Sequence, residues 1–200
     1  MQKQKQVNYF GFGTNRDLEM MENMVGRKNI KGEHAKLLGY EITIQKANQF
    51  RTDVSPTSPV PNTSPKDLIL KVWGPDFEMF TSRPNPKGVA YGTIWYLSPS
   101  EFELVREWEI VDFGCQEDAY GEAITDDGKK VRVITQSLLK PAEIDRVISG
   151  DDYEPYIWNK KTMLEQADRV RKEYLNMKSR LPLEKQQEIN QFIENLIDKV

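Results

Sequence analysis

The chain has 200 residues, of which 38% are hydrophobic and 30% are charged, and its formal net charge at pH 7 is −3. This composition is typical of one globular domain and excludes a disulfide-stapled miniprotein, since the chain has a single cysteine. Because the sequence has no basic stripe, no signal-type segment and no apolar run of about 18 residues, we expect a cytoplasmic protein with no nucleic-acid and no membrane partner.

A strand, a tight turn and a helix form the first predicted motif. Residues 7–12 are rich in aromatic side chains, as in a strand, and end at a Gly-Thr turn, after which Asn15 is expected to cap a helix over 16–25. Alternating apolar and polar residues predict a second strand over 39–45. A turn of this kind can present backbone N–H groups to an anion, although it is more often purely structural.

The middle of the chain is predicted to be mainly sheet. Residues 51–66 are rich in Pro, Ser, Thr and Asn and poor in apolar side chains, which predicts a mobile surface loop. Four strands are expected after this loop, over residues 68–73, 88–97, 120–125 and 130–135. A second Pro-rich stretch over 82–87 separates the first two of these strands, and an Asp-Asp-Gly hairpin turn joins the last two.

The helix that begins after Ser98 has the best-defined start in the chain and carries a carboxylate in an unusual place. Ser98 is the expected N-cap, Pro99 the first helical residue, and Glu101 completes a capping box. Three charged residues fall on the outer side of its helical wheel: Glu103, Arg106 and Glu107. Glu109 instead falls among the apolar positions. Either the helix has ended and Glu109 lies in solvent, or a half-buried carboxylate beside Trp108 has a raised pKa and can transfer protons.

The last third of the chain is predicted to be helical. Helices are expected over 142–149 and 162–177, and the final helix carries apolar residues at three- and four-residue spacing: Ile189, Phe192, Ile193, Leu196 and Ile197. These apolar stripes are expected to pack on the body of the same chain, with a homodimer contact as the less favoured alternative.

Taken in order, these features resemble the γ-glutamylcyclotransferase-like family. Five segments carry the likeness: 9–15 (YFGFGTN; YFAYGSN in the family), 35–40 (the second-strand pattern), 88–98 (GVAYGTIWYLS; GVVWGVLYELS), 105–110 (VREWEI; LDxxEG) and 144–150 (IDRVISG; YLxxIxxG). The resemblance implies an α+β fold, with a small mixed β-barrel-like sheet and surrounding helices over 1–158. Residues 159–200 are then a C-terminal helical extension packed on the same domain.

The resemblance also implies a reaction. In this family the free α-amino group of a γ-glutamyl amine or γ-glutamyl amino acid attacks its own γ-carbonyl, which releases the amine and 5-oxoproline without a cofactor. Glu109 would be the catalytic general acid and base, taking a proton from the ammonium and delivering it to the leaving nitrogen. The implied substrate-binding residues are Tyr9, which would line the pocket, and Phe12, Gly13, Thr14 and Asn15, whose backbone would hold the α-carboxylate.

Departures from the family pattern leave alternatives open. This chain has Arg106 where the family has Asp, Ile110 where the family has Gly, and Gln116 where some members have Tyr. Arg106 and Ile110 favour a second interpretation, a catalytically silent binding or regulatory module with the same pocket. A third, an interaction protein that binds a partner through its C-terminal helices, is based on the amphipathic pattern of those helices. Neither Cys115 nor His34, the only residues of their types, is expected to be catalytic or to bind a metal.

Overall fold

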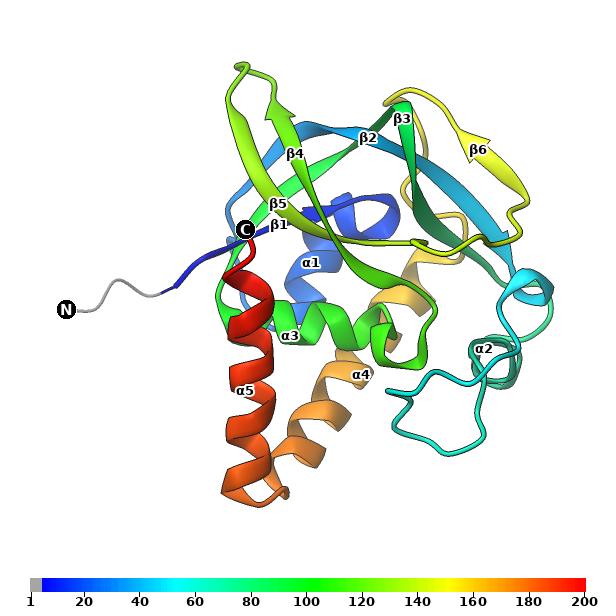
Figure 1. The fold of residues 1–200 in the computed structure, drawn as a ribbon, viewed down its shortest axis with the longest axis vertical. Coiled ribbons are helices and arrows are strands. Elements are labelled where there is room, and N and C mark those ends of the chain that lie inside the picture. Colours follow the sequence, from blue (N-terminus) through cyan, green and yellow to red (C-terminus); the bar gives the residue numbers. More distant parts are fainter. Residues whose placement is uncertain (1–4) are drawn as a thin grey trace.

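The computed structural model describes residues 5–200 as an α+β fold built around a closed β-barrel (Figure 1). The five barrel strands are β1 (Val7–Gly11), β2 (Gly32–Lys46), β3 (Glu78–Leu97), β4 (Glu117–Thr125) and β5 (Lys130–Ser137). They pair in the order β3-β1-β5-β4-β2, and the additional pairing of β2 with β3 closes the ring. A sixth strand, β6 (Arg146–Ile148), pairs with residues 42–44 of β2.

The single long strand β3 contains the strand expected over 88–97 and begins ten residues before it. The Pro-rich stretch over 82–87, expected to separate strands, lies inside β3, so this expectation was wrong. Pro84 pairs opposite Tyr40 of β2, next to a register shift at Gly39. On its other side, β3 pairs with β1 only over residues 93–97. The prolines therefore lie where a missing N–H breaks no ladder hydrogen bond.

The helices cover one side and one end of the barrel. They are α1 (Leu18–Val25), α2 (Pro65–Val72), α3 (Pro99–Trp108), α4 (Lys160–Ser179) and α5 (Leu183–Ile197). In Figure 1, α3 crosses beneath the barrel, α4 and α5 lie below it, and α2 stands apart at the side. One apolar cluster, including Phe10 and Leu37, fills the barrel, and a second, including Tyr9 and Phe102, lies between barrel and helices.

Two further expectations about local structure were wrong. Residues 68–72 of the segment expected as a strand belong to α2, and residue 73 is its C-cap. The N-cap of this helix, Ser64, forms a capping box with Asp67. Residues 142–149, expected as a helix, instead include β6, because the edge of β2 offers unpaired backbone groups to which this segment bonds.

The first turn also differs from the expectation in one detail. Asp17, rather than Asn15, caps α1, and its carboxylate accepts a hydrogen bond from the backbone N–H of Met20 (3.0 Å). A 3₁₀ turn over Gly13–Arg16 precedes the helix. The Asn15 side chain is thereby released from capping and can turn inward.

The C-terminal helices bury charged residues that were expected to face solvent. Glu103 and Arg106 on α3 are only 6% and 8% exposed. Lys178 of α4 binds the Glu103 carboxylate (2.6 Å), and Arg106 binds Asp118 (2.9 Å) beneath α5. No helix within residues 5–200 is long and apolar enough to cross a membrane. The division into residues 1–158 and 159–200 and the mobility of the loop over 51–66 stay predictions.

Candidate active site

Glu109 lies at the junction of the helices and the barrel. The helix α3 ends at Trp108 and Glu109 is its C-cap, with its N–H bonded to the Val105 carbonyl (3.0 Å). The side chain is nevertheless only 6% exposed, so the residue is both at the helix end and buried. Burial raises the pKa of Glu109 to about 7, because the charged carboxylate loses its hydration.

Two side-chain amides hold the Glu109 carboxylate in place. The Asn15 amide donates to Oε1 at 2.7 Å, and the Gln116 amide donates to Oε2 at 2.8 Å. Both bonds favour the ionised form and act against burial, which remains the larger effect on the pKa. The carboxylate is thus oriented by neutral donors, with no cation among its hydrogen-bond partners in residues 5–200.

Asn15 connects Glu109 to Tyr9 on β1. Its side-chain amide nitrogen also donates to the Tyr9 hydroxyl at 2.8 Å, and its backbone carbonyl oxygen accepts from the Trp95 indole at 2.7 Å. Tyr9 is fully buried, and this burial, together with the nearby Glu109 charge, raises the pKa of Tyr9 well above its ordinary value. Tyr9 is therefore a neutral phenol that fixes Asn15, which in turn fixes Glu109.

The turn before Asn15 is packed more tightly than an open anion site would be. Gly13 has a φ of +56°, and a Cβ at this position would lie 2.5 Å from the Phe80 ring. The Gly13 N–H donates to the Tyr153 hydroxyl at 3.2 Å, so a phenol oxygen occupies the place expected for a substrate oxygen. The structure thus brings Asn15 to Glu109 directly and Tyr9 to it through Asn15, and leaves Gly13 covered.

A small cavity lies beside the carboxylate, with a volume of about 50 Å³. Six of the residues that line it are Thr14, Trp73, Phe77, Trp108, Glu109 and Trp158, and Phe12 also contributes to its wall. The Trp73 and Phe77 rings stack at 4.9 Å, and Phe77 meets Trp158 edge-on at 5.8 Å. A volume of this size holds a few water molecules. An amino-acid-sized ligand therefore requires these aromatic walls to move apart.

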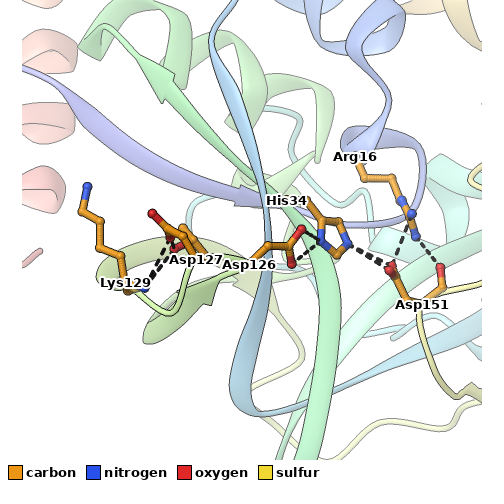
Figure 2. A network of polar contacts seen from close by, with 7 residues as sticks. Arg16, His34, Asp126, Asp127, Lys129 and Asp151 are labelled. Atoms are coloured by element: carbon orange, nitrogen blue, oxygen red, sulfur yellow. Dashed lines mark hydrogen bonds and ion pairs between the residues drawn. The ribbon is translucent and has the colours of Figure 1, made fainter.

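A polar network anchors the segment that carries Tyr153 and Trp158 (Figure 2). Arg16 donates to the Asp151 carbonyl at 2.9 Å and lies over the Tyr153 ring, 4.6 Å from its centre. His34 on β2 bridges Asp151 (3.0 Å) and Asp126 of the β4–β5 turn (2.9 Å), as Figure 2 shows. These hydrogen bonds raise the pKa of His34, although partial burial opposes them. The side of the cavity formed by Trp158 is thus held by a segment that is anchored at Asp151 through Arg16 and His34.

The remaining candidates do not contribute reactive groups. Cys115 is 3% exposed, and burial raises the pKa of its thiol to about 12, so the thiolate is absent near neutral pH. Within residues 5–200 no three His, Cys, Asp or Glu side chains gather as a metal site would need. The role of Gln116 as a partner of Glu109 was not foreseen from sequence. It depends on a chain reversal between the two residues, where Ile110 has a φ of +49°.

Comparison with known proteins shows the fold. No family model and no curated protein matches the sequence. A solved structure described as gamma-glutamyl cyclotransferase superposes with a TM-score of 0.51 at 15% identity, covering 98% of this chain and 99% of that one. The chain has the γ-glutamyl cyclotransferase fold. An uncharacterised protein from Homo sapiens also has this fold, with a TM-score of 0.52, 15% identity and coverage of 97% and 99%. The expected α+β barrel class is thereby confirmed, and activity has to be argued from the site itself.

Proposed function

We propose that this protein is a γ-glutamylcyclotransferase-type enzyme, which cyclises a γ-glutamyl amine or γ-glutamyl amino acid to 5-oxoproline and releases the amine. The observation that carries the proposal is the buried Glu109 carboxylate beside a small cavity, with a pKa of about 7. A carboxylate with this pKa exchanges protons in both directions near neutral pH, as one residue acting first as base and then as acid must do.

The proposed chemistry needs no group beyond the substrate and Glu109. Glu109 takes a proton from the substrate α-ammonium, whose nitrogen then bonds to the γ-carbonyl carbon. The bond from that carbon to the leaving nitrogen breaks as Glu109 returns a proton to this nitrogen. Over a full turnover the attacking nitrogen loses two protons and the departing amine gains two, so charge is conserved. Because the ring closes within one molecule, holding a curled substrate supplies much of the acceleration.

The neighbours of Glu109 have positioning roles in this proposal. Asn15 and Gln116 each fix one carboxylate oxygen, so the proton is taken and returned along a defined direction. Thr14 lines the cavity and keeps a hydroxyl where the family motif has Ser, available to a substrate carboxylate or developing oxyanion. For the Gly13 N–H to take part, the Tyr153 hydroxyl has to be displaced by the substrate.

A catalytically silent binding module is the second candidate. The observation in its favour is the limited space: the cavity beside Glu109 measures only about 50 Å³, and the Gly13 N–H is already bonded. Such a module would bind a small ligand through the same residues without turning it over. The two candidates differ in one measurable result, which is the release of 5-oxoproline.

The test is 5-oxoproline release from a panel of γ-glutamyl amino acids and γ-glutamyl amines, with wild type and Glu109→Gln side by side. Glutamine preserves the shape of the side chain and removes its proton transfer. We expect release by wild type and a loss of about 100-fold or more in the folded variant. If no panel member is converted while some raise the melting temperature, the binding module replaces the enzyme.

A further inference from the structure

A second, larger cavity lies on the other side of the aromatic residues that cover Glu109. It measures about 360 Å³ and is formed by α2, the end of α3 and α4. Most of its lining is apolar, as in Val72, Trp73, Trp108, Phe113, Val170 and Met177. A space of this size and character accommodates a small organic molecule.

Two hydrogen-bond acceptors in this cavity have no partner among residues 5–200. Glu107 lines it, and its carboxylate takes part in none of the hydrogen bonds or ion pairs of that part of the chain. The Oε1 atom of Gln166, on the facing helix α4, is buried and receives no hydrogen bond. A buried acceptor left without a donor is costly, so the Gln166 oxygen favours a ligand that donates. The Glu107 carboxylate is partly exposed and can bind a cationic group at the same place.

The charges around Glu107 also favour a cation. The neighbouring Arg106 is engaged by Asp112 (3.1 Å) and Asp118 (2.9 Å) rather than by Glu107. Burial and the nearby Asp112 raise the pKa of Glu107 to about 7, and the charge of Arg106 opposes this rise only in part. The cavity also has Arg169 and Glu173 in its lining, and both are exposed to solvent.

The two cavities share a wall. Trp73, Trp108 and Ile110 line both of them, and the two indole rings meet edge-on at 6.2 Å. Glu109 lines the smaller cavity and Glu107 lines the larger one, while Trp108 between them in the sequence lines both.

We propose that the larger cavity binds an organic ammonium ion with an apolar body, and, resting on the proposed function, that this ion is the amine released from the γ-glutamyl group. The ammonium donates to the Glu107 carboxylate and to Gln166 Oε1, while the apolar body contacts Trp73, Val170 and the rest of the apolar lining. Indole rings add cation–π attraction for the same charge. The preferred substrates are then γ-glutamyl amides of apolar amines, rather than those with acidic or small polar leaving groups.

The first experiment measures binding without turnover. The probe is 2-phenylethylamine, compared with 2-phenylethanol and 3-phenylpropionate, which keep the aromatic body and change the head group. Calorimetric titration of the full chain at pH 8 is expected to show binding of the amine at least tenfold tighter than of the alcohol, and weakest binding of the acid. Equal affinity for amine and alcohol, or no binding of the amine, overturns the site.

Single substitutions test whether these ligands bind in the larger cavity. Glu107→Gln is expected to remove the preference for the amine over the alcohol, and Val72→Arg to weaken both ligands at least tenfold. Val72 is 48% exposed, so the larger side chain is compatible with folding. Leu70→Arg is the matched control on the same helix, because Leu70 is 37% exposed and lines neither cavity. Loss of binding in Leu70→Arg equal to that in Val72→Arg contradicts the assigned location.

The link to catalysis is tested separately. Release of 5-oxoproline from γ-glutamyl-2-phenylethylamide is expected to exceed release from γ-glutamylglycine in kcat/KM, and Val72→Arg is expected to abolish the difference. If the amine binds but no substrate releases 5-oxoproline, the amine site in the larger cavity is supported and the proposed function is contradicted. If 5-oxoproline is released from both substrates with the same kcat/KM, only the assignment of the bound ion as the leaving amine is contradicted.

Discussion

Replacing Glu109 with Gln is expected to change how stability depends on pH. In the native protein the pKa of Glu109 is raised from its ordinary 4.5 to about 7 by burial. A carboxyl group with a raised native pKa binds its proton more tightly when folded, so its contribution to stability falls as pH rises from about 4.5 to about 7. When this linkage is integrated between the two pH values, the ionisation of Glu109 lowers the free energy of unfolding of wild type by about 2.5 kcal/mol from pH 5 to pH 8.

Glutamine has no such ionisation, so the variant gains stability relative to wild type as pH rises. Its amide oxygen can accept from Asn15, and Gln116, whose Oε1 has no hydrogen-bond donor in residues 5–200, can rotate to accept from the new amide. The assay is urea unfolding of both proteins at pH 5 and pH 8. Glu107, whose pKa is also raised to about 7, is present in both and cancels in the comparison. A difference between the proteins that stays constant with pH would refute the reasoning.

Three further predictions concern single side chains. Asn15→Leu removes a hydrogen bond that favours the Glu109 anion, so the pKa of Glu109, read from the pH profile of 5-oxoproline release, is expected to rise above 7; an unchanged profile contradicts the assigned role. His34→Gln is expected to destabilise the chain below pH 6.5 and to lose this effect as pH rises through the raised pKa of His34; unfolding at pH 5.5 and pH 9 checks this sign, and an effect of equal size at both values would count against the network. Ser64→Ala is expected to lower the free energy of unfolding by about 1 kcal/mol through loss of the α2 cap; a neutral result in urea denaturation would contradict it.

The features predicted correctly from sequence are those that depend on nearby residues. Ser98, Pro99 and Glu101 define the start of α3 through contacts within one turn, and the structure has this cap. The same logic applies to Ser64, Pro65 and Asp67, although the short apolar run that follows was interpreted as a strand. Short apolar segments suit either structure, and in this case the cap was the better guide.

The features that were missed depend on residues far away in the chain. Residues 146–148 form a strand because β2 offers them an edge, which no local pattern shows. Glu103 and Arg106 are buried because α4 and α5 cover α3, and Arg106 also binds Asp118 of the barrel strand β4, which the helical wheel does not show. Helical periodicity left the burial of Glu109 as one of two alternatives, and its bond to Gln116 depends on the chain reversal around Ile110.

The homodimer suggested by the C-terminal helices stays a prediction. Leu183 on α5 is 70% exposed, and Leu175 and Met177 on α4 are about half exposed. If these residues form a dimer contact, Leu183→Lys is expected to shift the chain to a monomer in light scattering. A monomeric wild type would remove the prediction.

The most direct test of the central claim is the pH dependence of kcat/KM for 5-oxoproline release, measured on wild type and Glu109→Gln with the best substrate of the γ-glutamyl panel. Wild-type activity is expected to rise with pH through an apparent pKa of about 7, since Glu109 must be ionised to accept the first proton. The folded Glu109→Gln variant is expected to show no such rise and little activity at any pH. Wild-type rates and an unchanged profile in the variant would show that Glu109 is not the proton-transferring group.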